Sequence, residues 1–170
     1  MPIKQRMSKE DSFLREIYQR GAIFFWIALV VVALDQLTKF IIKSTLALGE
    51  SFPVSGFFQF THVHNTGAAF SIFRDHTFLL AICSMIGVVI LLFLVFYLSK
   101  RVEFLSSLPA KISLGLIMGG TLGNLIDRLS YGYVIDFIDF SFFATFNVAD
   151  SAITVGAILL ALSYIRLVKD

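Results

Sequence analysis

Cysteine is almost absent from this chain of 170 residues, which contains only Cys83. A lone cysteine excludes an intrachain disulfide, and without a cysteine cluster the sequence has no zinc-site pattern. Cys83 lies inside an apolar run, so we interpret it as a small buried hydrophobic residue. Histidine is also scarce, at three residues, and the HExxH pattern of metalloproteases is missing. We therefore expect neither a metal ion nor another cofactor.

Charge is the second shortage. Charged residues make up 15% of the chain and the formal net charge is +2. No basic patch with interleaved aromatic residues occurs, so nucleic acid is not an expected partner. Hydrophobic residues instead make up 57% of the chain, and the mean hydropathy is +0.83. A soluble domain of this length is less apolar, so the composition indicates an integral membrane protein.

Four apolar segments reach or approach the length of about 20 residues that crosses a bilayer. They run approximately over residues 21–42, 78–98, 112–129 and 148–168. We therefore predict one membrane-embedded domain over residues 1–170, mainly α, built as a bundle of four transmembrane helices in contact with membrane lipids. The rest forms an N-terminal arm, mobile or lying on the membrane surface, and two long loops, over residues 1–20, 43–77 and 130–147.

The distribution of basic residues predicts the orientation of these segments. Ten of the 14 lysines and arginines lie in the N-terminal arm, in the loop between the second and third segments, and at the C-terminus. The other four lie toward the opposite side. We therefore predict that both termini are cytoplasmic and that the two long loops lie outside the cytoplasmic membrane.

Two charged residues lie near the end of the first segment. Asp35 and Lys39 are four residues apart, so they meet on one helix face and can neutralise each other. Two interpretations remain open for them. They are either an interfacial pair with Lys39 extended toward water, or a pair that supports a functional site.

Small and polar residues mark the third segment. Gly115, Gly119 and Gly123 repeat every four residues, a spacing that lets helices approach closely in lipid. These glycines can pack against other helices of the same chain, so we expect a monomer. Asn124 and Arg128 should point into the bundle rather than at lipid. Arg128 then makes either a structural contact or a contact with a substrate.

The fourth segment begins with a polar face made by Asn147, Asp150, Ser151 and Thr154, which follow helical spacing. Asn147 can cap the helix, and Asp150 three residues later resembles a capping arrangement. Asp150 is therefore either a carboxylate favoured by the helix terminus or a chemically active group.

The long loops add further polar residues. Residues 57–65 alternate weakly, which predicts a short strand, and the turn signal around Asn65 and Gly67 follows it. His62 and His64 are two residues apart on that strand, a spacing that by itself gives only weak support for a metal site. Asp136 lies in the second long loop, before an aromatic run.

These polar groups should meet at one membrane face, because the first and third segments end there and the fourth begins there. A carboxylate in the bilayer costs roughly 2.5–3.5 kcal/mol, so the presence of Asp136 and Asp150 at one membrane face needs a functional explanation. Two close carboxylates share a proton, so one can activate water while the other protonates a carbonyl oxygen. This favours an acid/base pair that hydrolyses a peptide bond. The alternatives are a small transporter or ion-coupling protein, or a structural membrane protein.

Five motifs occur in register with the four segments: LDQLTK at 34–39, NTGAAFS at 65–71, GNLIDR at 123–128, VIDF at 134–137 and FNVADSAIT at 146–154. With them the chain resembles the bacterial lipoprotein signal peptidases, the type two signal peptidases, over residues 21–167. The resemblance implies four transmembrane helices with a small extracytoplasmic β-cradle in the inner membrane. It implies an aspartic endopeptidase that removes the signal peptide of prolipoproteins before their diacylglyceryl-modified cysteine, and that is inhibited by cyclic peptides of the globomycin type.

The resemblance also implies roles for single residues. Asp136 and Asp150 match the catalytic pair. The family's residues that line or support the site correspond in this sequence to Asn65, Gly67, Asn124, Arg128, Asn147, Asp35 and Lys39. Asp139 is a further acid three residues after Asp136. If 134–140 is a strand, the two acids face opposite sides, so only one can meet Asp150, and the motif favours Asp136.

Overall fold

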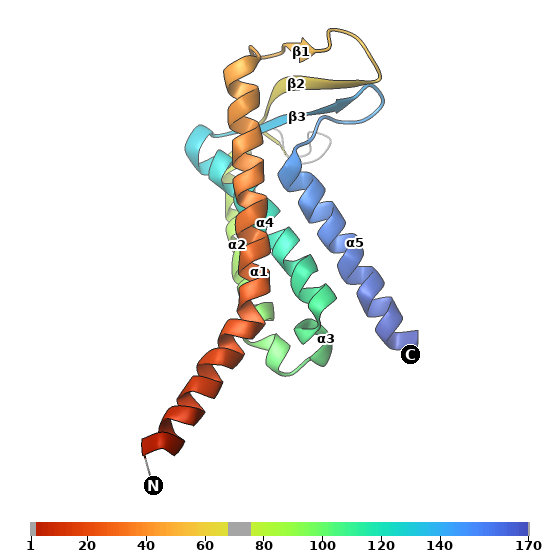
Figure 1. Cartoon of the computed structure of the whole chain (residues 1–170). Coiled ribbons are helices and arrows are strands. Elements are labelled where there is room, and N and C mark those ends of the chain that lie inside the picture. Colours follow the sequence, from red (N-terminus) through yellow and green to blue (C-terminus); the bar gives the residue numbers. More distant parts are fainter. Residues whose placement is uncertain (1–2, 68–75, 170) are drawn as a thin grey trace.

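The structure, a computed structural model, describes residues 3–67 and 76–169. Within these residues, four long helices extend from a small sheet toward the opposite end, where both termini lie (Figure 1). They are α1 (Ile3–Thr45), α2 (Thr77–Phe96), α4 (Leu108–Tyr131) and α5 (Val148–Lys169). Two short helices, η2 (Leu98–Lys100) and α3 (Glu103–Ser106), connect α2 with α4. The part of the 65–71 motif from residue 68 onward lies outside the described residues.

Three helical segments of the described chain are long and apolar enough to cross a membrane: Gly21–Thr45, Thr77–Lys100 and Val148–Val168. They coincide with three of the four predicted segments. The other one, 112–129, forms most of α4, whose glycines, Lys111 and Asn124 lower its hydropathy. The mainly helical membrane fold is therefore confirmed, while the fourth crossing stays a prediction at this point.

The N-terminal arm differs from a simple mobile tail. Helix α1 is continuous from Ile3 to Thr45, so residues 3–20 extend the helix beyond the predicted first segment, as the red end in Figure 1 shows.

Helix α4 is the centre of the bundle, because it packs against α1, α2 and α5. Its start is fixed by Ser107, whose hydroxyl accepts the backbone N–H of Ala110 at 3.3 Å. Its end is fixed by Gly132 in a left-handed conformation, with φ of 77°. The buried apolar cluster at its core consists of Phe24 and Ala28 of α1, Leu91 and Val95 of α2, and Leu114 and Met118 of α4.

The glycine stripe of α4 provides the close approach to α1. A methyl group on Gly115 would lie 2.9 Å from the carbonyl oxygen of Phe24, and one on Gly119 would lie 2.6 Å from Cβ of Val31. Both distances are too short for a real contact. The stripe is therefore used inside the bundle, as the sequence spacing predicts.

Replacing Gly119 by alanine is expected to lower the free energy of unfolding by roughly 1–3 kcal/mol, because the new methyl group forces α1 and α4 apart. The thermal unfolding midpoint in detergent checks this. Gly87→Ala in α2 is the matched control, since its methyl group would lie 3.9 Å from Cγ2 of Thr121, an ordinary contact. Equal midpoints for the two variants would contradict the packing argument.

The sheet has three antiparallel strands in the order β1–β2–β3: Ser51–Phe52, Phe58–Asn65 and Val134–Phe140. The strand that the sequence predicts at 57–65 is thus confirmed, and residues 134–140 do form a strand, which the sequence alone left as a condition. The register pairs Val63 with Asp136 and Asn65 with Val134, so the end of β2 lies beside Asp136. The sheet crosses the ends of the helices and brings both long loops to the same end of the bundle (Figure 1).

One prediction about the helices is wrong. Cys83 is exposed on α2 rather than buried. An apolar helix in a membrane protein directs most of its surface toward lipid, so an apolar neighbourhood in the sequence does not imply burial in the protein.

Candidate active site

The N-terminus of α5 is closed by a reciprocal cap between Asn147 and Asp150. Asn147 Oδ1 accepts the backbone N–H of Asp150 at 2.9 Å, and Asp150 Oδ2 accepts the backbone N–H of Asn147 at 3.2 Å. This is the capping box that the spacing of the two residues predicts. The same contacts point the Asp150 carboxylate back toward the sheet end of the bundle.

Asp136 lies on β3 and is 2% exposed. Its Oδ2 accepts the side-chain amide of Asn65 at 2.8 Å, and its Oδ1 accepts that of Asn147 at 2.7 Å. Asn65 is itself held by Gly67, whose backbone N–H donates to Asn65 Oδ1 at 2.9 Å. The turn after β2 therefore orients the amide that holds Asp136.

Asn147 connects the two carboxylates. Its side-chain Nδ2 bonds to Asp136, while its side-chain oxygen and backbone N–H bond to Asp150. Asn124 of α4 supports this arrangement, because its Nδ2 donates to Asp150 Oδ1 at 2.8 Å and its Oδ1 accepts from Asn147 at 3.1 Å. Two predicted acids thus share one network of three asparagines.

A buried ion cluster lies directly behind these asparagines. Lys39 Nζ lies 2.8 Å from Asp35 Oδ2 and 2.9 Å from Asp127 Oδ2, and it donates to Asn124 Oδ1 at 3.0 Å. All three charged side chains are at most 2% exposed. The three donors of the ammonium group are therefore satisfied within the protein. Of the two open interpretations for Asp35 and Lys39, the burial of Lys39 contradicts the water-extended one. That the pair supports a functional site stays a prediction.

Asp35 and Asp127 extend this cluster to α5 and the sheet. Asp35 Oδ1 accepts the backbone N–H of Ala149 at 2.9 Å, which satisfies another free donor at the start of α5. Asp127 Oδ2 accepts the backbone N–H of Ile135, beside Asp136, at 3.1 Å. Gln36 donates to Asp127 Oδ1 at 3.0 Å. The cluster thus fixes both elements that carry the predicted acids.

The sequence did not predict the contacts that Asp127 and Gln36 make at this site. Both stand inside motifs quoted for the resemblance, GNLIDR and LDQLTK. Their charge or amide within an apolar segment was the available signal, since buried polar groups in membranes need partners.

Arg128 and Asp139 make hydrogen bonds to residues outside the network of asparagines, although the charge of Arg128 acts on Asp136 and Asp150. Arg128 extends from α4 toward α2, where its Nη1 donates to Ser84 Oγ at 3.4 Å. Asp139 accepts the hydroxyl of Thr61 at 2.9 Å, on the other face of β3 from Asp136. The predicted alternation of the two acids along the strand is therefore confirmed.

The pKa of Asp136 is raised to about 7. Burial is the main cause, and the neighbouring charge of Asp150 acts in the same direction. The hydrogen bonds from the side-chain amides of Asn65 and Asn147 lower the pKa, but their effect is smaller. Asp136 can therefore hold a proton near neutral pH, where an ordinary aspartate does not.

This raised pKa has a consequence for stability. Between pH 4 and pH 7 the folded protein holds a proton on Asp136 that the unfolded chain has released, since the pKa is 3.8 in the unfolded chain and about 7 in the folded one. The stabilisation that this proton gives the folded protein is complete below pH 3.8 and is lost as the pH rises through about 7. The unfolding free energy is expected to fall across this window by at most about 1.4 kcal/mol per pH unit.

Thermal unfolding in detergent at several pH values checks this slope. Asp136→Asn should flatten it, whereas Asp139→Asn, with its carboxyl on the opposite face, should keep it. A slope that is unchanged in Asp136→Asn would mean that another group is responsible.

The histidines do not assemble a metal site. His62 donates from Nδ1 to the carbonyl oxygen of Leu46 at 2.9 Å, and its ring lies 5.1 Å from that of His64. Among the residues that the structure describes, no group of three His, Cys, Asp or Glu side chains could hold a metal ion.

Known proteins are similar to this chain in sequence and fold. The family model described as signal peptidase (SPase) II matches residues 27–166. A lipoprotein signal peptidase from Dehalococcoides mccartyi is 54% identical over 146 residues, covering 86% of this chain and 91% of the relative. Lipoprotein signal peptidases from Moorella thermoacetica and Coxiella burnetii are 43% and 44% identical over 138 and 142 residues, each covering 81% of this chain and respectively 89% and 86% of the relative.

A solved structure described as a bacterial membrane enzyme superposes with a TM-score of 0.76 at 34% identity, covering 84% of this chain and 87% of that one. The matching model, the identities and the fold agree with the resemblance carried by the motifs. The chain therefore belongs to the signal peptidase II family, the membrane hydrolases that remove signal peptides from lipoproteins.

Proposed function

We propose that the chain is an aspartic endopeptidase in which Asp136 and Asp150 form the catalytic pair. It removes the signal peptide of prolipoproteins that carry a diacylglyceryl-modified cysteine, and it cuts on the N-terminal side of that cysteine. The observation that carries this proposal is the shared partner of the two acids. Asn147 bonds to Asp136 at 2.7 Å and caps against Asp150 at 2.9 Å, so both carboxyl groups face the same end of the bundle.

The raised pKa of Asp136 suits it to act as the acid. Asp150 takes a proton from the attacking water while the oxygen–carbon bond forms, and Asp136 gives its proton to the carbonyl oxygen. When the tetrahedral intermediate collapses, the amide C–N bond breaks. Asp136 then regains a proton from the hydroxyl group, and Asp150 gives its proton to the leaving amine. The pair thus ends with the single proton with which it began.

The supporting residues keep this pair in place. Asn65 and Gly67 hold Asp136, and Asn124 holds Asp150. Asp35 and Lys39 fix the start of α5 and the side chain of Asn124 from behind. Arg128 remains half-buried beside Ser84 and is available to bind a carbonyl group of the substrate backbone.

We further propose that α4 is the fourth transmembrane helix. Its 24 residues rise about 36 Å, which is enough to cross the hydrocarbon layer, and its polar residues Ser113, Asn124 and Asp127 are buried. The excess of basic residues places both termini in the cytoplasm and the sheet outside the inner membrane. Since the glycine stripe is used within one chain, the enzyme acts as a monomer. Globomycin-type cyclic peptides would bind across the two acids.

Cleavage of purified precursor in detergent tests the proposal. Wild-type enzyme should cut a diacylglyceryl-modified prolipoprotein, should not cut the same precursor without the lipid, and should keep its rate in a metal chelator. The rate should fall as pH rises through about 7, because Asp136 loses the shared proton. Failure of well-folded wild-type enzyme to cut the modified precursor would refute the proposal.

The rival function, transport of an ion, is less well supported. A transport path needs polar groups through the whole depth of the membrane. Among the described residues, the buried charged and amide side chains lie at the sheet end of the bundle. Of the remaining buried hydroxyls, Ser113 and Ser99 lie away from the sheet and donate to the carbonyl oxygens of Pro109 and Val95 in the preceding turn.

A further inference from the structure

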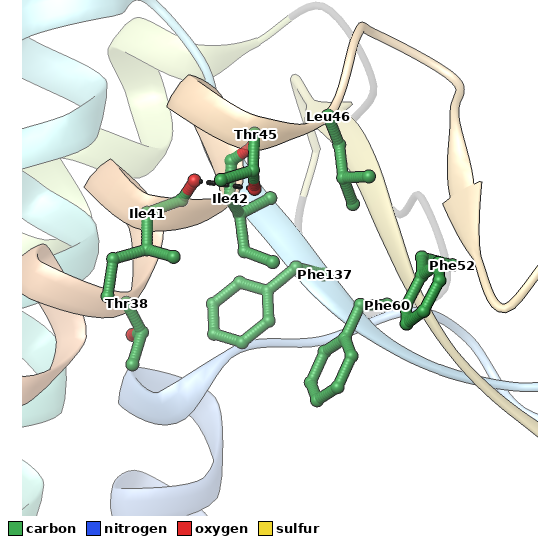
Figure 2. A pocket seen from close by; sticks show the side chains of 8 residues that line it. All are labelled: Thr38, Ile41, Ile42, Thr45, Leu46, Phe52, Phe60 and Phe137. Atoms are coloured by element: carbon green, nitrogen blue, oxygen red, sulfur yellow. Dashed lines mark hydrogen bonds between the residues drawn. The ribbon is translucent and has the colours of Figure 1, made fainter.

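An apolar groove lies between α1 and the sheet and encloses about 470 Å³ (Figure 2). One wall is the end of α1 from Thr38 to Thr45 with the following residue Leu46, and the other consists of one phenylalanine from each strand: Phe52, Phe60 and Phe137. Every lining side chain is a hydrocarbon or a threonine. The groove therefore offers a surface for hydrophobic contact.

The two threonines do not make the groove polar. Thr38 donates its hydroxyl to the carbonyl oxygen of Leu34 at 2.8 Å, and Thr45 donates to that of Ile41 at 2.8 Å. Both hydroxyls are thus engaged within α1. The dashed line in Figure 2 marks the bond from Thr45 to Ile41. A peptide in this groove would bring backbone N–H and C=O groups that the walls cannot satisfy, at a large cost in free energy. A hydrocarbon chain brings none.

The groove continues the membrane-facing surface of α1. The candidate span Gly21–Thr45 contains most of the helical wall, and Ile41 and its neighbour Leu37 are 47% and 55% exposed. On the sheet side, Phe52 is 67% exposed. An apolar surface thus runs from the lipid-facing side of α1 through the groove onto the sheet, where contiguous exposed apolar area marks an interaction site.

The groove and the acid pair lie on opposite faces of β3. Asp136 and Phe137 are consecutive residues of this strand, so their side chains project to opposite faces. Asp136 contacts Asn65 and Asn147, whereas Phe137 lines the groove with Ile41. A substrate whose scissile bond lies at Asp136 would have its lipidated cysteine on the other side of the strand. This arrangement favours a chain from the surrounding bilayer over one from the substrate as the occupant of the groove.

We propose that this groove binds one acyl chain of a membrane phospholipid from the leaflet on the sheet side. The chain fills the space between α1 and the three phenylalanines, and it thereby supports the strand that carries Asp136. The choice of a bilayer lipid over the lipid of the substrate rests on the proposed cleavage site at Asp136. The protein then has a lipid site that is separate from the site of peptide cleavage.

Native mass spectrometry of the enzyme released from detergent, with a single added phospholipid, tests the site. Thr45→Trp fills the groove, and Leu37→Trp on the same helix adds the same side chain outside it. Wild type and Leu37→Trp should retain one phospholipid. Thr45→Trp should bind it about tenfold more weakly, the effect of losing contact with about two methylene groups. Equal retention by both tryptophan variants would overturn the proposal.

A second measurement uses fluorescence and avoids reliance on the groove-filling variant. Trp26 is the only tryptophan, so Phe60→Trp in a Trp26→Phe background reports from the groove wall. Phospholipids with brominated acyl chains should quench this tryptophan as strongly as one at Leu37. An unquenched signal at position 60 beside a quenched one at 37 would show that lipid does not enter the groove.

The inactive variant Asp136→Asn separates the two proposals. It should retain the phospholipid while it loses peptide cleavage. Displacement of the phospholipid by a lipid-modified precursor would instead show that the groove belongs to the substrate, which would also overturn the proposal.

Discussion

Prolipoprotein cleavage is expected to fall by on the order of 10²–10⁴-fold when Asp150 is replaced by asparagine, and by a similar factor in Asp136→Asn. Each substitution removes one member of a pair that must move protons in both directions. The helix cap should survive in Asp150→Asn, because the new side-chain oxygen can still accept the backbone N–H of Asn147, now accepted by Asp150 at 3.2 Å. Initial rates on a lipid-modified precursor, divided by the amount of folded enzyme, check this expectation.

Asp139→Asn is the matched control for both variants. It lies three residues from Asp136 on the same strand, but its carboxylate accepts from Thr61 on the opposite face. Its rate should stay within a few-fold of the wild-type rate. If Asp139→Asn loses activity while Asp136→Asn keeps it, the assignment of the pair must change to include Asp139.

Replacing Lys39 by methionine is expected to lower the unfolding free energy by about 3–5 kcal/mol, the usual cost of removing one partner from a buried ion pair. The substitution leaves the carboxylates of Asp35 and Asp127 buried without the ammonium group that now lies within 2.9 Å of both. It also removes the donor to Asn124, so cleavage should decline even in the molecules that fold. Thermal unfolding and yield from membranes measure the first effect.

Lys43→Met controls for the loss of a positive charge near the same end of α1. Lys43 is exposed and lies 4.1 Å from the centre of the Tyr131 ring, a contact worth roughly 0.5–1 kcal/mol. A second test is rescue: Asp127→Asn combined with Lys39→Met removes one stranded charge and should restore part of the lost stability. If Lys39→Met is as stable as Lys43→Met, the buried cluster does not hold the site together.

The parts of the site that follow local rules could be predicted from the sequence. The cap between Asn147 and Asp150 follows from their spacing at the start of an apolar helix. The opposite directions of Asp136 and Asp139 follow from the alternation of a strand. The meeting of the polar segment ends follows from the threading of the chain through a membrane.

The parts that depend on tertiary contacts could not be predicted. The spacing of Asp35 and Lys39 could not distinguish a buried Lys39 from an interfacial one, because Asp35 can neutralise the lysine in either position. The second carboxylate, Asp127, approaches Lys39 only when α4 packs against α1 through the glycine stripe. Its contact with Ile135 further depends on the left-handed turn at Gly132, which returns the chain toward the bundle. Helical periodicity carries no information about such contacts.

The capping contacts at Asn147 also fix the position of Asp150 along the axis of helix α5. The carboxylate of Asp150, one of the two proposed catalytic acids, is three residues from the cap, so its height above the bilayer centre follows the apolar length of α5. The 22 residues of this helix rise about 33 Å, close to the hydrocarbon thickness. With Asp150 as a catalytic acid, we expect the scissile bond of a precursor to be cut at the depth of this carboxylate. Lengthening α5 by one turn would move that depth by about 5.4 Å and would select a different bond.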